Sequence, residues 1–316
     1  MIKMKNLKYL LGIALFSQVL AFFWMYDFNQ EKQKNNFDNL FSFNPSSFEK
    51  IIIDDGNDQM TLLKSNEKWS FYHSEELLPA DSFKIDGFLS KIRELKADWP
   101  TAKTFSSHKR FEVAEDAYQR KVCLYSSKKE SPLEFFFGSS PSFKKIHLRK
   151  KDQKEVFAVN LNLYELSTNP SEWLDKSLLS VEEINKIKGS DFSIEKIDEL
   201  WVFSQDASSE TSLRKIKVDA EKVENFLSAL SRLHIVNLAQ KEQPTSPPIS
   251  LEIESSNQRW TYQFFSDENS HYISRSDLNS LFQLSKIDYE KFANISLSDL
   301  ANSESEQIEE NEDSST

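Results

Sequence analysis

DSFKIDGFLSKIREL, residues 81–95, aligns without gaps with DAEKVENFLSALSRL, residues 219–233. In both stretches apolar residues recur at positions i, i+3, i+4, i+7 and i+10, which is the spacing of one buried helix face. Each stretch begins with an aspartate, whose carboxylate can accept hydrogen bonds from the free amides of a first helical turn. The sequence therefore predicts two equivalent helices, with buried faces formed by Ile85, Phe88, Leu89, Ile92 and Leu95 and by Val223, Phe226, Leu227, Leu230 and Leu233.

The match continues downstream of both helices, with an offset that shrinks as loop deletions would produce. Phe136-Phe137-Gly138 aligns with Phe264-Phe265-Ser266, Ile146–Arg149 with Tyr272–Arg275, Val156–Val159 with Leu281–Leu284, and Tyr164 with Tyr289. Short alternating runs around each helix predict strands, and tight turns between them predict antiparallel pairing. The predicted fold class is α+β, with a single N-terminal transmembrane helix followed by two tandem, internally duplicated units of antiparallel sheet, each packed by an amphipathic helix. Whether the units share one sheet or form two stays open.

The predicted strands fall in two groups. The first group is Lys50–Ile53, Met60–Leu63, Trp69–Tyr72, Val122–Tyr125, Leu133–Phe137, Ile146–Arg149 and Val156–Val159. The second group is Leu200–Phe203, Leu213–Ile216, Ile249–Ile253, Trp260–Phe265, His271–Ser274 and Leu281–Leu284.

The N-terminus has the composition of a membrane anchor. LLGIALFSQVLAFFWMY, residues 10–26, has no charged residue and follows three lysines. At 1.5 Å per residue, such a helix reaches the lower end of what a ~30 Å hydrocarbon core requires. Because positive charge lies before the apolar run, we expect the N-terminus in the cytoplasm and the body on the periplasmic side of the inner membrane. The alternative is a signal peptide cleaved after Ala21, although Phe22–Tyr26 continues the apolar run.

These features predict six segments. They are a cytoplasmic basic N-terminus (1–9), a transmembrane helix (10–26), a polar tether (27–47), a first α+β repeat (48–190), a second α+β repeat (191–300) and a disordered acidic tail (301–316).

Composition excludes several classes of function. The five glycines are isolated from one another, so no loop can bring clustered backbone amides to a phosphate. The net charge of −11 becomes −14 once the three N-terminal lysines are removed, and nucleic acid is not an expected partner of so acidic a body. The lone cysteine, Cys123, excludes an internal disulfide, and no histidine has a second ligand at the spacing of a metal-binding helix. We therefore predict no catalytic, cofactor-binding or metal-binding residues.

Three local motifs allow two interpretations each. Asp54–Asp58 is interpreted as a hairpin turn rather than a calcium loop, because the alternating ligands and distal glutamate of such a loop are missing. Trp173–Lys176 is interpreted as a tryptophan packed beneath a following helix, with Asp175 and Lys176 fixing the turn, and a contact to a partner is the alternative. The basic cluster at 144–151 is interpreted as a solvated hairpin, with a surface for anionic lipid or an acidic partner as the alternative.

An ordered series of short blocks resembles the DUF4340 family of bacterial membrane-anchored proteins. The blocks are Lys68-Trp69, Leu78–Asp81, Arg110–Ala114, Arg120–Val122, Phe137–Pro141, Ile146–Arg149, Val156–Val159 and Trp173–Lys176. Many members have glycine where Glu112 stands, so the turn there is expected to differ. We take as family-motif residues, with a structural role, Trp69, Pro79, Ala80, Asp81, Gly138, Pro141, Trp173, Asp175 and Lys176.

The resemblance implies a membrane helix, an extracytoplasmic body and association with ABC transport systems of the gliding-motility type. It implies no catalytic residue. We therefore expect a non-catalytic accessory protein of an ABC-type envelope transport system, held in the inner membrane through residues 10–26, with an ABC permease or another envelope protein as partner. The alternatives are a cell-envelope hydrolase whose site is assembled from distant residues and a cleaved periplasmic ligand-binding protein. The sequence leaves the oligomeric state open.

Overall fold

The computed structural model describes residues 14–21, 40–96, 99–204, 217–240, 244, 246–256, 258–267 and 269–302. Within these ranges no helix is both long and apolar enough to cross a bilayer, and residues 14–21 are helical. Most of the predicted transmembrane segment and nearly all of the acidic tail lie outside the described residues. The chain divides into two compact units: a first unit of Met1–Phe48, Ile52–Gln59 and Asp86–Leu166, and a second unit of Glu49–Ile51, Met60–Ile85 and Ser167–Thr316.

The first of two eight-stranded sheets has the strand order β10-β9-β8-β7-β1-β2-β3-β4. Its antiparallel hairpins follow from alternating sequences, in which every second side chain points into the core. In β1, for example, Ile51 and Ile53 are buried and their neighbours are not. The strands are β1 (Lys50–Asp54), β2 (Gln59–Ser65), β3 (Lys68–His73), β4 (Glu76–Pro79), β7 (Arg120–Tyr125), β8 (Leu133–Phe137), β9 (Lys145–Lys150) and β10 (Phe157–Asn160).

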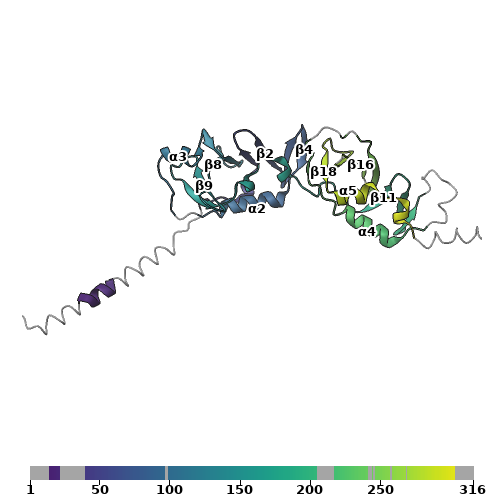
Figure 1. Ribbon diagram of the computed structural model, residues 1–316, viewed down its shortest axis with the longest axis horizontal. Helices are drawn as coiled ribbons and strands as arrows, with labels where there is room; N and C mark the ends of the chain where they lie inside the picture. Colours follow the sequence, from purple (N-terminus) through teal and green to yellow (C-terminus); the bar gives the residue numbers. More distant parts are fainter. Residues whose placement is uncertain are drawn as a thin grey trace, which may run out of the picture. The chain divides into compact units, whose positions relative to one another are not determined.

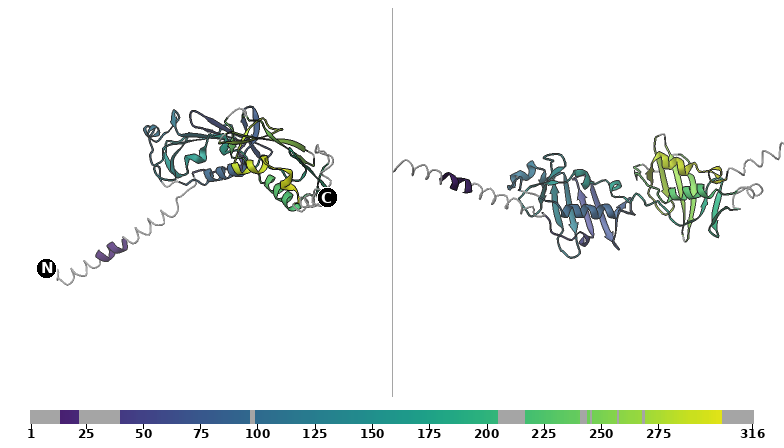
Figure 2. Two further views of the ribbon diagram at one scale, coloured as in Figure 1. Left: turned by 45° about the vertical axis from the view of Figure 1, so that its right-hand side comes forward. Right: turned by 90° about the horizontal axis from the view of Figure 1, so that it is seen from below.

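Helix α2 (Ser82–Arg93) lies across one face of this sheet (Figure 2). The Asp81 carboxylate accepts a hydrogen bond from the Lys84 amide at 2.9 Å, which confirms the predicted cap. The apolar stripe predicted for this helix is buried along its whole length. Residues around Val113, Phe136 and Val156 form a further core cluster. Its neighbours include α3 (Ser106–Arg110) and the small hairpin of β5 (Val113–Ala114) and β6 (Ala117–Tyr118).

The second sheet has the order β13-β12-β11-β15-β16-β17-β18-β14. Its strands are β11 (Ile184–Lys188), β12 (Ser193–Ile197), β13 (Leu200–Phe203), β14 (Asn237–Leu238), β15 (Ile249–Ser255), β16 (Gln258–Ser266), β17 (His271–Arg275) and β18 (Phe282–Leu284). Helices α4 (Ala220–Leu230), α5 (Lys286–Ala293) and α6 (Leu297–Leu300) belong to the same unit as this sheet (Figure 1). The Asp219 carboxylate caps α4 by accepting from the amides of Glu221 and Lys222.

The predicted α+β class is confirmed, the pairing is mostly antiparallel, and the strands form two eight-stranded sheets beside the small β5–β6 hairpin. The second predicted helix stripe is buried except at Leu227, which is half-buried. The predicted strand Leu213–Ile216 lies outside the described residues. The strands β4, β5, β6, β11, β12 and β14 are not among the predicted ones, and β11 belongs to the second sheet although the domain prediction places its residues in the first repeat.

Cys123 lies on β7 with 5% of its surface exposed, and burial raises the pKa of its thiol to about 11. Since a free thiol titrates near 8.5, we expect a disulfide reagent at pH 8 to react on the order of 100-fold more slowly with the folded chain than with the urea-unfolded chain. The folded state holds this proton more tightly, so its stability should also decrease as the pH rises from about 9 toward 11. Equal reaction rates in the folded and unfolded chains would contradict the burial of Cys123. The variant Cys123→Ala, which has no thiol, gives the background signal.

Candidate functional site

Two family-motif segments that are far apart in the sequence meet in the second unit. The Asp81 amide donates to the carbonyl of Trp173 at 2.8 Å, and the Asp175 amide donates to the carbonyl of Pro79 at 3.1 Å. The bonds form an antiparallel bridge where α2 begins, so they fix the start of the helix against the later segment. Backbone atoms of four motif residues therefore hold the two segments together: Pro79, Asp81, Trp173 and Asp175.

Trp69 and Ala80 belong to the same arrangement. The Ala80 amide donates to the Trp69 carbonyl at 2.9 Å, and Ala80 forms the bridge with Leu174. The Trp69 amide donates to the hydroxyl of Ser82 at 3.2 Å. Trp69 itself is buried, so its side chain belongs to the core.

Trp173 is almost fully buried, with 1% of its surface exposed. Its indole nitrogen donates to the Ser167 carbonyl at 2.9 Å, which satisfies the one polar atom of the ring. The ammonium of Lys84 lies 5.4 Å from the centre of the ring. Trp173 is therefore packed as expected, but the residues that follow it form turns rather than the expected helix. A buried indole offers no surface to a partner.

Lys176 connects this motif to β14. Its ammonium donates to the Val236 carbonyl, and its own carbonyl accepts from the Ile235 amide at 3.0 Å. Burial lowers the pKa of Lys176. Beside it, the Asp175 carboxylate accepts from both the amide and the hydroxyl of Ser177. The segment that leads into β14 is therefore held by both the ammonium and the backbone carbonyl of Lys176.

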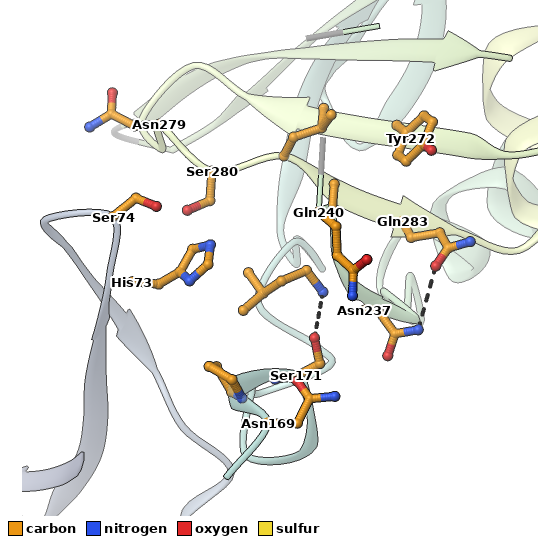
Figure 3. A pocket seen from close by; sticks show the side chains of 14 residues that line it. His73, Ser74, Asn169, Ser171, Asn237, Gln240, Tyr272, Asn279, Ser280 and Gln283 are labelled. Atoms are coloured by element: carbon orange, nitrogen blue, oxygen red, sulfur yellow. Dashed lines mark hydrogen bonds between the residues drawn. The ribbon is translucent and has the colours of Figure 1, made fainter. Parts of the chain in front are cut away.

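A cavity of about 1030 Å³ adjoins this motif within the second unit, and we call it the polar hollow. Its walls come from three separate parts of the sequence: the β3–β4 turn, the segment before Trp173, and β14 with the β17–β18 region (Figure 3). The polar residues that line it are His73, Ser74, Asn169, Ser171, Asn237, Gln240, Tyr272, Asn279, Ser280 and Gln283. Pro170, Leu238, Ala239 and Leu281 complete the lining.

The lining of the polar hollow contains no aspartate, glutamate, lysine or arginine among the described residues. At the chain's average of 28% charged residues, about four of fourteen lining residues would be charged. Several lining groups are already positioned by neighbours: the Ser171 hydroxyl accepts from the Leu238 backbone amide at 3.0 Å, and the side-chain amide of Asn237 donates to the side-chain oxygen of Gln283 at 3.4 Å. The hollow therefore presents neutral donors and acceptors rather than charges.

Glu76 fixes one rim of the polar hollow. Its carboxylate accepts from the amides of Asn279 and Ser280 at 2.8 and 2.9 Å, and from the Ser280 hydroxyl at 2.6 Å. Both carboxylate oxygens accept hydrogen bonds, so the Glu76 carboxylate stabilises the turn at Asn279 and Ser280. The hollow was not predicted from the sequence, because its amides and hydroxyls lie on segments that no periodic pattern connects.

The motif glycine, Gly138, lies in the first unit. A side-chain carbon there would stand 1.9 Å from the Phe111 carbonyl oxygen and 2.6 Å from that of Glu112, so only glycine permits this close approach. The amide of Ser139 donates to the Phe111 carbonyl at 3.0 Å. Pro141 is exposed in the loop that follows. These residues shape the connection between β8 and β9, and they do not line the polar hollow.

Glu112 has a backbone φ of +55°, in the left-handed region that favours glycine. The turn at Glu112 is expected to differ from the turn in family members that have glycine there. Its backbone nevertheless has a conformation that glycine adopts readily. We expect Glu112→Gly to be neutral or to stabilise the chain by up to about 1 kcal/mol, and Glu112→Val to destabilise it by roughly 1–2 kcal/mol, because β-branched residues are strained there. Urea denaturation of both variants measures their free energies of unfolding, and the glycine variant should be the more stable one. A valine variant as stable as the glycine variant would contradict it.

Ser139 and His147 form a close pair, with the hydroxyl 3.2 Å from Nδ1 of the imidazole. The same Nδ1 lies 2.8 Å from the Ser139 carbonyl oxygen, which can only accept, so Nδ1 must carry the proton. It then cannot remove a proton from the hydroxyl. His147 is buried against Phe111, and burial lowers its pKa. The pair is consistent with packing rather than with nucleophilic catalysis.

Within the described ranges no group of three or more His, Cys, Asp and Glu side chains could hold a metal ion. The absence of cofactor, metal and catalytic residues remains a prediction. A family model described as a domain of unknown function, DUF4340, matches residues 69–252. Neither a curated protein nor a solved structure matches the chain.

Proposed function

The chain belongs to the DUF4340 family, and we propose that it is a membrane-anchored, non-enzymatic accessory protein of an ABC-type envelope transport system. In this proposal residues 10–26 hold the protein in the inner membrane and the body recognises a permease or another envelope protein. The observation that carries the proposal is the polar hollow, a built concave surface of neutral donors and acceptors. Concave sites with a few oriented polar groups are the usual places for recognition.

The chemistry of the hollow favours recognition over catalysis. General acid–base work requires a group whose protonation changes between ground state and transition state, and its efficiency depends on a tuned pKa. The hollow offers amides and hydroxyls that do not titrate, beside His73 and the phenol of Tyr272. Such groups can bind and orient a partner through hydrogen bonds, each of which contributes about 1 kcal/mol when it is well formed.

The finer part of the fold prediction, an internal duplication, is also part of this proposal. Several features support it. Apart from the edge strands β4 and β14, both sheets have three strands followed by four, in the orders β3-β2-β1-β7-β8-β9-β10 and β13-β12-β11-β15-β16-β17-β18. The isolated bridge of Ala102 with Val156 occupies the place that β14 takes beside β18. Two sheets of common origin would give the body two related surfaces for partners.

Two buried arginines support the same relationship. Arg149 and Arg275, which the sequence alignment pairs, are 3% and 8% exposed. Each lies over an aromatic ring of a neighbouring strand, Phe136 at 4.6 Å and Trp260 at 5.5 Å. Each also donates to a backbone carbonyl of a segment outside its sheet, Arg149 to Val113 at 2.7 Å and Arg275 to Leu178 at 3.0 Å. A buried arginine is rare and costly, so its recurrence at aligned positions favours common ancestry.

Photo-crosslinking tests the proposed recognition. A benzophenone amino acid in place of Asn279, at the rim of the hollow, should crosslink in intact cells to an inner-membrane or envelope protein of a transport system. The change Gln240→Glu, which replaces an amide by a carboxylate of nearly the same shape, should reduce the crosslink at least fivefold. The matched change Gln258→Glu, on an exposed strand end outside the hollow, should leave it unchanged. Equal crosslinking in all three chains would refute a role for the hollow.

Membrane topology needs a separate measurement. A reporter that is active only outside the cytoplasm should be active when fused after Thr316, and intact mass should show a chain that begins before Phe22. A reporter active only in the cytosol would refute the proposed orientation. A soluble periplasmic chain beginning at Phe22 would favour the cleaved ligand-binding protein instead.

A further inference from the structure

Two segments of the first unit have the opposite charge to the rest of the protein. Residues 96–110 and 143–156 together contain ten lysines and arginines against three acidic residues, a net charge of +7 in a chain of −11. The basic residues are Lys96, Lys103, Lys109, Arg110, Lys144, Lys145, Arg149, Lys150, Lys151 and Lys154, and the acidic ones are Asp98, Asp152 and Glu155. Such a concentration of charge favours an anionic partner.

The tertiary structure brings the two segments together. The Thr101 amide donates to the Val156 carbonyl at 2.7 Å, and Nε2 of His108 lies 2.9 Å from the Lys154 carbonyl. The Lys154 ammonium lies 4.8 Å from the centre of the Phe105 ring. These contacts place residues 101–108 beside residues 154–156, and we call the exposed surface of the two segments the basic face.

Not every cation of the basic face is available. Arg149 is buried, Lys150 donates to the Leu40 carbonyl, and Lys151 pairs with Glu134 at 2.6 Å. Lys109 pairs with Asp116 at 2.6 Å. The remaining exposed cations on this face are Lys96, Lys103, Arg110, Lys144, Lys145 and Lys154.

Three large aromatic side chains of the same two segments are exposed, and two of them, Phe105 and Phe143, lie beside a lysine ammonium. Trp99 is 83% exposed, Phe105 is 65% exposed and Phe143 is 86% exposed. Large aromatic groups are normally buried, because removing them from water is favourable. Aromatic rings beside lysines are typical of surfaces at the membrane interface, where the ring enters the headgroup region and the ammonium meets phosphate.

The chain enters the folded body next to the basic face. The Leu40 amide donates to the carbonyl of Leu95, which shortly precedes Trp99 in the sequence, at 2.9 Å. Only residues 27–39 separate Leu40 from Tyr26, the end of the proposed anchor. Thirteen residues can span at most about 45 Å, even when the chain is fully extended. An anchor at 10–26 would therefore keep this face within reach of the bilayer.

We propose that the basic face docks on the anionic phospholipid headgroups of the membrane that holds the anchor. Trp99, Phe105 and Phe143 enter the headgroup region, and the six exposed cations contact lipid phosphates. The inference rests on the proposed anchor for its geometry, but the surface has its own charge and aromatic pattern. Nucleic acid has the same charge as the lipid, and it is an outcome of the test rather than a second proposal.

The test uses the full chain in nanodiscs. A polarity-sensitive fluorophore on Ser106→Cys reports the environment of α3, since the native Cys123 is buried. In a two-to-one mixture of phosphatidylcholine and phosphatidylglycerol we expect blue-shifted emission and at least a twofold reduction in iodide quenching, relative to phosphatidylcholine alone. The triple variant Lys103→Glu, Lys144→Glu, Lys154→Glu should abolish this difference. The charge-matched variant Lys68→Glu, Lys128→Glu, Lys129→Glu should retain it.

Three results would overturn the proposal. They are equal quenching in both lipid compositions, equal loss in the two triple variants, and displacement of the label from the lipid by a short DNA oligomer at a concentration below that of the lipid. Failure of the anchor is distinguishable, because the chain would then not co-elute with the nanodiscs. In that case the docking of the basic face is tested by co-sedimentation of the free chain with vesicles of the same two-to-one mixture. The first triple variant should lose co-sedimentation and the charge-matched triple variant should keep it.

Discussion

Replacing Trp173 by alanine should lower the free energy of unfolding by about 3–5 kcal/mol, the largest effect we expect of a single change in this protein. The ring is among the largest fully buried side chains, and its removal leaves a cavity. The Ser167 carbonyl would also lose the donor that now lies at 2.9 Å. Because the Trp173 backbone accepts from Asp81, the loss should extend to the first turn of α2. Urea denaturation of the full chain in mild detergent measures the total effect, and hydrogen exchange of residues 81–85 measures the local one.

Trp99 provides the matched control. It is the same residue type but 83% exposed, so Trp99→Ala should change the free energy of unfolding by less than about 0.5 kcal/mol. If both changes cost the same, the tryptophan of the motif would not be the packed element described above. The conservative change Trp173→Phe should recover part of the loss, since it keeps a ring in the cavity but removes the indole donor.

Replacing Gly138 by alanine should cost about 3 kcal/mol or more, near the upper end of overpacking effects. The added carbon would stand 1.9 Å from the Phe111 oxygen, and that atom belongs to the backbone, which cannot rotate away as a side chain could. The loop of Phe111 and Glu112 would have to move, and with it the hydrogen bond from Ser139 to Phe111. Thermal unfolding and proteolysis of the first unit should both show the loss.

Gly87→Ala is the opposite case and serves as the control. Gly87 lies within α2, and a side-chain carbon there meets nothing within 4 Å. Alanine is a better helix former than glycine by up to about 1 kcal/mol, so this change should stabilise the chain. Two identical substitutions should thus shift the unfolding midpoint in opposite directions. A destabilising Gly87→Ala would show that the packing around α2 differs from that described.

Local pattern accounts for the elements that were predicted correctly from the sequence. The helix stripes that begin at Ile85 and Val223 are buried because 3.6-residue periodicity places one face in a core whatever the partner. The strands with strong alternation were found for the same reason. The strand β11 was missed because its buried residues, Ile184 and Ile187, lie out of strict alternation beside a bulge. The strand β4 is short and ends in a proline, which weakens its pattern.

The candidate site was much less accessible from sequence. The motif residues were identified as a set, but their pairing, with Pro79 to Asp81 against Trp173 to Asp175, depends on contacts between distant segments. The basic cluster at 144–151 was visible, yet Arg149 proved to be buried and Lys150 bound to a backbone carbonyl. The polar hollow had no sequence signal, because asparagine, glutamine and serine are equally common in ordinary loops.

The sequence by itself determined the class of the fold, the two helices and their caps, and most of the strands, because these depend on residues near one another along the chain. It also showed that the chain resembles DUF4340. The tertiary structure decided that the strands form two sheets, that Gly138 faces the backbone of Phe111, and that amides from three segments line one hollow. These features depend on which distant segments touch, and periodicity along the chain reports which residues are buried but not what they are buried against.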